Sequence, residues 1–200
     1  MPVILGVGSS AMTIDSSKSS PAAKPFIASH RRVVTGHDEQ GRSIFIYDGP
    51  APNMRQPDAS PNMAMIDLWE TSSMPVSNVG NLDSADRPIR LSPPPNGSIF
   101  RILVLPPESE RNFSAVSDVF SQWGEPGVLS KRDRHPAFHK TNTLDYAIVL
   151  EGEVWALMDV GEKLLKAGDV LIQRGTNHAW SNRSNSPVRI AFVLLDAQPL

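Results

Sequence analysis

The feature that most constrains the fold of this chain is a dense run of short β-type segments in its last third. The candidate strands of this run cover residues 144–150, 153–158, 169–173 and 188–195. Gly152 and a turn at 159–161 separate the first of them from their neighbours. Short strands with closely spaced turns are typical of a β-sandwich or β-barrel and not of an alternating βαβ fold.

The first half of the chain has a weaker β pattern. Residues 32–35 and 43–47 are separated by turn-forming residues and are candidates for a hairpin. Residues 63–69 alternate moderately, and residues 98–105 form a strong apolar strand that two prolines end. The chain therefore predicts an all-β fold of antiparallel strands from about residue 26 onward.

One helix is expected, over residues 109–123. Phe113, Val116, Val119 and Phe120 fall at helical spacing, and Gly124 follows where a helix would end. We expect this helix to be a minor part of an otherwise β structure.

The chain is long enough for one domain with a sizeable core. It has 200 residues, of which 40% are hydrophobic. Residues 1–25 are rich in Ser, Ala and Pro and predict a flexible tail, which leaves residues 26–200 as the folded domain.

Composition excludes several classes of function. The net charge is -2 and there is no basic stripe, so we expect no nucleic-acid partner. The absence of cysteine excludes disulfides, thiolate metal sites and a cysteine nucleophile. No apolar stretch is long enough to cross a membrane, and no Lys or Arg precedes the apolar first residues as in a secretory signal. A cytoplasmic protein without a membrane partner is the expectation.

Two stretches contain the residues whose side chains can bind a metal or take part in catalysis. The first runs from His139 through Thr141 and Asp145 to Gly152, and the second runs from Gly168 through Gln173 and Gly175 to His178, Trp180 and Asn182. Together they resemble the two motifs of the cupins, small jelly-roll β-barrels also called RmlC-like. The resemblance covers about residues 135–195 and implies a cupin-type antiparallel barrel. Since this fold hosts many unrelated functions, the resemblance indicates the fold much more strongly than the activity.

The resemblance also implies a metal site, with departures. His139 occupies the first His position and His178 the third, whereas Thr141 stands at the second His, Asp145 replaces the usual Glu and Gln173 replaces a Pro. Two imidazoles and one carboxylate on a metal leave positions open to substrate, which suits Fe(II) and also Zn, Mn or Ni. We therefore expect His139, Asp145 and His178 to converge on one divalent metal at about 2.0–2.2 Å. Each also has a purely structural alternative, as a surface His, a capping or paired Asp, or a His bonded to a strand end.

Neighbouring residues suggest a substrate pocket. Side chains two apart on a strand share a face, so Trp180 and Asn182 should lie beside His178. Thr141 should face the same cavity without binding the metal, and Trp155 could add an apolar wall. Such a pocket favours an organic substrate with an aromatic or aliphatic body.

Three functions are consistent with this site. The first is a metal-dependent lyase, a decarboxylase or dehydratase acting on a small carbonyl or carboxylate compound, in which Asp145 and His178 are catalytic. Without a metal, Asp145 would act as a general base. The second is an Fe(II) dioxygenase, and the third is a non-enzymatic small-molecule binder. By analogy with similar cupins, secondary metabolism is the expected setting. We also expect a homodimer, because the strands within residues 31–47 offer a spare β-edge.

Overall fold

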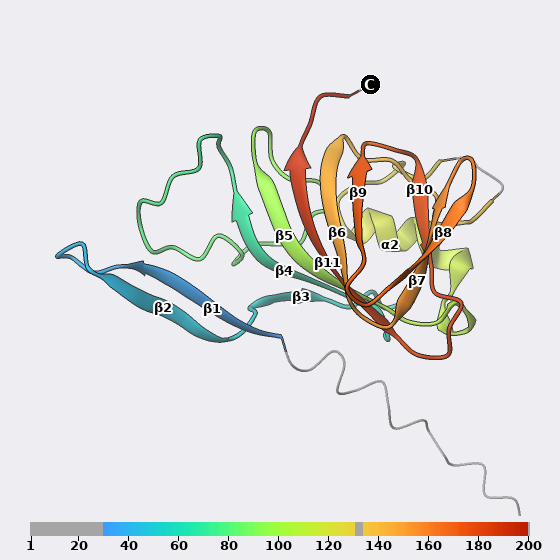
Figure 1. Ribbon diagram of the computed structural model, residues 1–200, viewed down its shortest axis with the longest axis horizontal. Helices are drawn as coiled ribbons and strands as arrows, with labels where there is room; N and C mark the ends of the chain where they lie inside the picture. The colour runs from blue at the N-terminus through green and yellow to red at the C-terminus, as the bar shows by residue number, and fades with distance from the viewer. Residues whose placement is uncertain (1–29, 131–133, 200) are drawn as a thin grey trace, which may run out of the picture.

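The fold is built from two antiparallel sheets that face each other, with an additional hairpin (Figure 1). The computed structural model describes residues 30–130 and 134–199. The expected flexible tail at 1–25 lies outside these residues. The larger sheet has six strands in the order β3-β4-β5-β11-β6-β9, and the smaller has three in the order β10-β7-β8. This architecture confirms the expected all-β, cupin-type class.

The strands of the larger sheet come from both halves of the chain. They are β3 (Asn53–Arg55), β4 (Ala64–Thr71), β5 (Ser98–Leu105), β6 (Thr143–Glu151), β9 (Val170–Arg174) and β11 (Val188–Asp196). The last strand, β11, pairs with β5 on one side and with β6 on the other. The C-terminal strand therefore joins the N-terminal strands of this sheet to β6 and β9, which carry Asp145 and Gln173.

The smaller sheet covers one face of the larger one. It consists of β7 (Glu153–Met158), β8 (Glu162–Lys166) and β10 (His178–Ser181). Gly152 makes the tight turn from β6 into β7 with φ of +79°, and a Cβ at this position would lie 3.0 Å from the Pro187 carbonyl oxygen. Both the backbone conformation and the available space therefore favour glycine at this hairpin.

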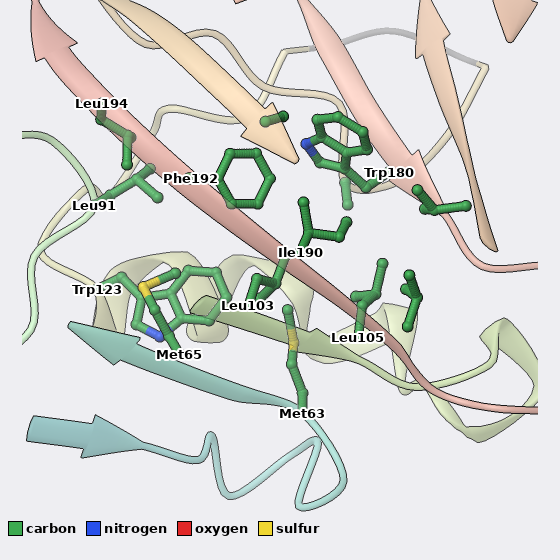
Figure 2. Close-up of a cluster of buried hydrophobic side chains, with 14 of the residues drawn as sticks. Met63, Met65, Leu91, Leu103, Leu105, Trp123, Trp180, Ile190, Phe192 and Leu194 are labelled. Carbon is green, nitrogen blue, oxygen red and sulfur yellow. The ribbon is translucent and has the colours of Figure 1, made fainter. Parts of the chain in front are cut away.

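The hydrophobic core lies between the two sheets (Figure 2). Leu103 and Ile190 contribute from the larger sheet, and Trp180 contributes from the smaller one. The short helix α2 (Val116–Gln122) adds Val119 and Phe120 to the same cluster. Along β5 the alternating residues Ile99, Arg101, Leu103 and Leu105 are all buried, as expected for one interior-facing side of a strand. The core therefore closes around the region where the two motifs meet.

The helix expected over residues 109–123 is shorter than its spacing suggested. Residues 108–115 form two 3-10 turns, η1 (Glu108–Glu110) and η2 (Phe113–Ala115), and only Val116–Gln122 is α-helical. The Asn112 side chain accepts a hydrogen bond from the Ser114 backbone N–H, which starts a new turn at that point. A side chain that captures a backbone donor in this way competes with a continuous helix.

The hairpin of β1 (Arg31–His37) and β2 (Ser43–Pro50) extends away from the two packed sheets (Figure 1). These strands pair only with each other among the strands of the described residues. None of the helices in the described ranges has the length and apolar character needed to cross a lipid bilayer.

Candidate functional site

A cavity of about 90 Å³ opens between the two sheets beside α2. Its walls are mostly apolar, with contributions from Leu103, Leu105, Phe120, Trp123, Trp180 and Phe192. Polar side chains also line it, principally Arg101, Arg111, His139, Thr141, Asp145 and His178. A largely apolar cavity with a few polar groups is the usual form of a site for a small organic molecule.

Two histidines from different motifs are brought into contact in this cavity. His139 and His178 are joined by a short antiparallel bridge, in which each backbone N–H donates to the other residue's carbonyl at 2.9 Å. Their ring centroids lie 4.2 Å apart. The pairing of the loop before β6 with the start of β10 therefore explains why residues 39 positions apart share one site.

Both imidazoles are oriented by backbone carbonyl groups. The Nδ1 of His139 lies 2.9 Å from the Ala137 carbonyl, and the Nδ1 of His178 lies 2.8 Å from the Thr176 carbonyl. Because a carbonyl can only accept, each Nδ1 carries the proton, and each Nε2 carries a lone pair that can accept a hydrogen bond when the ring is neutral. Burial lowers the pKa of His139 to about 4. Burial and the neighbouring His139 lower the pKa of His178 well below its usual range, so both rings are neutral at pH 7.

Asp145 is connected to the histidines through Gln173. The two residues lie opposite each other on β6 and β9. The Gln173 amide nitrogen donates to Asp145 Oδ2 and to His178 Nε2, both at 3.0 Å. An amide group has two N–H donors, so one glutamine satisfies both acceptors. In the sequence, Gln173 is visible only as a departure from the family pattern, and nothing there indicates this role.

The Asp145 carboxyl is buried and retains bonding capacity. Its Oδ1 has no hydrogen-bond partner within normal geometry among the described groups. The Thr143 hydroxyl lies nearby and is bonded to the Thr141 hydroxyl at 2.7 Å. Burial raises the pKa of Asp145 to about 6, although Thr143, the Arg101 charge and the Gln173 amide each act to lower it. A carboxyl with a pKa near neutrality can take up and release a proton under physiological conditions.

The expected metal site of His139, Asp145 and His178 stays a prediction. Within residues 30–130 and 134–199, no group of three His, Asp or Glu side chains is placed to hold a metal ion. His139 and His178 are adjacent, but the Gln173 amide lies between His178 and Asp145. The residue that replaces the usual Pro therefore lies between the Asp145 carboxylate and the His178 imidazole in this arrangement.

Two of the other expected pocket residues line the cavity. Thr141 does so, with its hydroxyl bonded to Thr143. Trp180 lines it too, and its ring packs edge-on against Phe192 and His178 at centroid distances of 5.5 and 6.1 Å.

The remaining two lie elsewhere. Trp155 is not in the cavity wall; it packs beside Phe138 and Leu157, and the Arg183 guanidinium stacks 4.8 Å from its ring centroid. The side chain of Asn182 donates to the carbonyls of Leu105 and Ser186 at 3.0 and 2.9 Å. Strand β10 ends at Ser181, so the alternation that placed Asn182 beside His178 no longer holds there.

Two arginines of the cavity were missed by sequence analysis. Arg101 is only 3% exposed and is held by Asp67, with 3.0 Å between its Nε and Oδ1. Arg111 lies between η1 and η2, and burial lowers its pKa to about 10, so it stays charged at neutral pH. A signal for Arg101 existed, because a charged residue interrupts an otherwise apolar strand at an inward-facing position. No comparable signal marked Arg111.

Comparison with known proteins agrees with the fold and the motifs. No family model matches the chain. It is 31% identical over 196 residues to phomopsin biosynthesis cluster protein C' of Diaporthe leptostromiformis, covering 92% of this chain and 87% of that protein. It is 30% identical to the cupin-domain-containing oxidoreductase srdD of Neurospora crassa, covering 84% and 75% of the two chains. It is also 30% identical to the cupin-domain-containing oxidoreductase fogC of Aspergillus ruber, covering 82% and 71%.

Two antiparallel sheets around a cavity that holds both motif histidines define a protein of the cupin class. The extent of similarity to srdD and fogC makes the assignment specific. The chain belongs to the family of cupin-domain proteins.

Proposed function

We propose that this protein is a lyase of secondary metabolism that removes a proton from a small organic compound, with Asp145 as the general base. The observation that carries the proposal is a buried carboxyl with a pKa of about 6 in an apolar cavity. The setting is supported by the similarity to a protein named for phomopsin biosynthesis. The reaction class rests on Asp145 and on its neighbours.

Dehydration is the form of the reaction that Asp145 can run by itself. Its carboxylate takes a proton from the carbon next to a carbonyl group, and the electron pair of that C–H bond forms a C=C bond. The bond to a hydroxyl on the next carbon breaks as the new carboxylic acid returns the proton to the departing oxygen. Water leaves, and Asp145 is again ionised. One carboxyl thus serves as base and then as acid, as a pKa close to neutrality permits.

The two neutral histidines and Gln173 position this chemistry. His139 Nε2 has no hydrogen-bond partner among the described groups, so it can accept a hydrogen bond from a substrate hydroxyl. Gln173 keeps the Asp145 carboxyl in place through Oδ2 and leaves Oδ1 for the proton. The apolar walls exclude water, which strengthens the electrostatic interactions within the cavity.

An oxidoreductase is the second candidate, and two observations favour it. The relatives srdD and fogC carry that name. His139 and His178 each bond through Nδ1 to a backbone carbonyl, an arrangement usual for histidines that bind a metal through Nε2. In this candidate His139 and His178 would hold a divalent ion such as iron, which would supply redox chemistry, and Gln173 would have to release His178 Nε2. The Asp145 carboxylate is not part of that set.

The test is turnover of a panel of β-hydroxy acids and β-hydroxy ketones, measured without O₂ and with a metal chelator. Formation of a conjugated product by the wild-type protein is expected, with a loss of about 100-fold or more in kcat for Asp145→Asn. Asp48→Asn is the control, because Asp48 lies in an exposed ion pair with Arg31 on the hairpin. Full activity of Asp145→Asn would contradict the proposal, and activity only with iron and O₂ would favour the oxidoreductase. Binding without turnover under any condition would favour the non-enzymatic alternative.

A further inference from the structure

Arg111 brings a poorly neutralised positive charge to the cavity wall. Its Nη1 donates to the Trp180 carbonyl at 3.3 Å, a long hydrogen bond. Its guanidinium carbon lies 4.6 Å from the centroid of the Phe113 ring, a cation–π contact. Neither partner carries a negative charge.

The other arginine of the cavity, Arg101, has a carboxylate partner and two backbone partners. Arg101 bonds through Nε to Asp67, through Nη1 to the Leu91 carbonyl at 3.0 Å and through Nη2 to the Arg90 carbonyl. These contacts hold its guanidinium against the Asp67 carboxylate and two backbone carbonyls, so we assign Arg101 a structural role.

Arg111 lacks such a partner in the part of the chain that the structure describes. No carboxylate there forms an ion pair with it. Glu108 is the acidic residue whose charge acts on Arg111, but its carboxylate is bonded to His135 Nε2 at 3.0 Å. No hydrogen bond among the described residues uses the Nε and Nη2 donors of Arg111, whose side chain lines the cavity.

The chemistry of this arrangement selects one kind of ligand. A partly buried cation without an ionic partner has lost part of its hydration, so an anion that pairs with it binds favourably. The planar guanidinium presents two parallel donors that match the two oxygens of a carboxylate. A single available cation balances one negative charge. A phosphate dianion would leave excess charge among apolar walls that also hold Asp145.

We propose that Arg111 is a carboxylate-binding residue and that the cavity takes small monocarboxylic acids with an apolar body. The acid group lies against Arg111, and the body extends along Trp180 toward Asp145, since all three line the same cavity. The inference rests on the proposed function in that it names the substrate class of the same site.

The experiment compares acids with their neutral amides. 3-Phenylpropionate and hexanoate, and the corresponding primary amides, are titrated into the full chain. Binding is followed by calorimetry and by tryptophan fluorescence, because Trp123 and Trp180 line the cavity. We expect saturable binding of at least one acid, with its amide weaker by about tenfold or more, as for the loss of a charge-assisted hydrogen bond.

Three variants separate the anchor from general effects. Arg111→Gln is expected to weaken binding of the acid by about tenfold or more and to leave the amide unchanged. Arg111→Lys keeps the charge without the planar fork and should retain part of the affinity. Arg183→Gln is the matched control, because Arg183 also stacks on an aromatic ring but lies outside the cavity wall.

Equal binding of acid and amide, unchanged acid binding in both Arg111 variants, or no acid binding at all would overturn the proposal. Asp145→Asn distinguishes this outcome from failure of the proposed lyase. If that variant keeps its turnover while Arg111→Gln loses acid binding, the carboxylate anchor stands and the lyase mechanism fails. If it loses turnover while acids and amides bind alike, the mechanism stands and the anchor fails.

Discussion

Asp145 ionises inside an apolar cavity, and its protonation state links activity to pH. The groups that face it are the Arg101 guanidinium from β5, the Thr143 hydroxyl and the Gln173 amide from β9. With a pKa of about 6, the carboxylate form is the majority only above that pH. We expect the kcat/KM of the wild type to fall as the pH drops below about 6. The Asp145→Asn variant should have low activity that does not change with pH in this range. A wild-type profile that stays flat from pH 5 to 8 would contradict the role of base.

The same pKa has a consequence for stability. The folded state raises the pKa of Asp145 from 3.8 to about 6, so it holds the proton more tightly than the unfolded chain does. The stabilisation from this group is therefore complete below about pH 4 and is lost as the pH rises through 6. Asn cannot ionise, so Asp145→Asn should be more stable than wild type at pH 8, by up to about 3 kcal/mol, and similar at pH 4.

Urea unfolding at pH 4.5 and pH 8 measures this difference. His139 and His178 are present in both proteins, so their own titration cancels in the comparison. A variant that is less stable than wild type at pH 8 would show that the ionised Asp145 carboxylate does not destabilise the folded state.

Motif residues and partner residues differ in how far the sequence could predict them. His139 and His178 were found because their spacing follows a known pattern, and both line the cavity. The bridge made by Gln173 depends on its register opposite Asp145, which a sequence does not display. Arg111 depends on how residues 108–115 turn at the end of the barrel. Contacts between residues on different strands therefore could not be predicted from the neighbouring residues in the sequence.

At the scale of elements, β9 and β10 bring Gln173 beside the His178 imidazole. The Gln173 amide nitrogen lies 3.0 Å from both His178 Nε2 and Asp145 Oδ2. A carboxylate in its place would add an anionic oxygen between two imidazoles and a second carboxylate, a donor set suited to divalent metals. Gln173→Glu is therefore expected to raise the affinity for Zn²⁺ or Mn²⁺ by about tenfold or more.

Calorimetric titration of the chelator-treated proteins checks this expectation. Gln122→Glu is the control, because that glutamine is exposed on α2. If the two variants bind metal equally weakly, the imidazole pair does not contribute ligands. Equally tight binding by the wild type would show that Gln173 is no obstacle.

The elements also differ in how well patterning predicts them. The closely spaced turns of the motif region predicted its strands, since each segment between two turns is too short to form a helix of several turns. The predicted helix was wrong over its first half, because the Asn112 side chain starts a separate turn there. The spacing of apolar residues does not indicate a hydrogen bond of this kind. The short β8 (Glu162–Lys166) escaped notice for a related reason, because three of its five residues are charged.

At the scale of the whole molecule, we propose that the protein forms a homodimer through the hairpin β1–β2. The hairpin extends from the packed sheets (Figure 1), and the Phe45 side chain on it is 75% exposed. Val33 and Ile44 are exposed on the same hairpin. Exposed apolar residues on unpaired strand edges are typical of association sites.

Light scattering tests the dimer. The wild type is expected at twice the 21.8 kDa chain mass and Phe45→Asp at the monomer mass, with the near-UV spectrum of the folded domain unchanged. Val160→Asp is the control, because Val160 is a similarly exposed apolar residue on a turn. A monomeric wild type at high concentration would contradict the proposal.

The apolar cavity has a consequence for the lifetime of the protein in the cell. Side chains around it give up contacts with one another to leave room for a guest, so the protein is less stable alone than with that guest bound. A ligand at 100 times its dissociation constant adds about 2.7 kcal/mol to folding. Proteolysis acts on the unfolded fraction, which this amount lowers by about 100-fold. Abundance of the protein should therefore follow the supply of its ligand, without any change in gene expression.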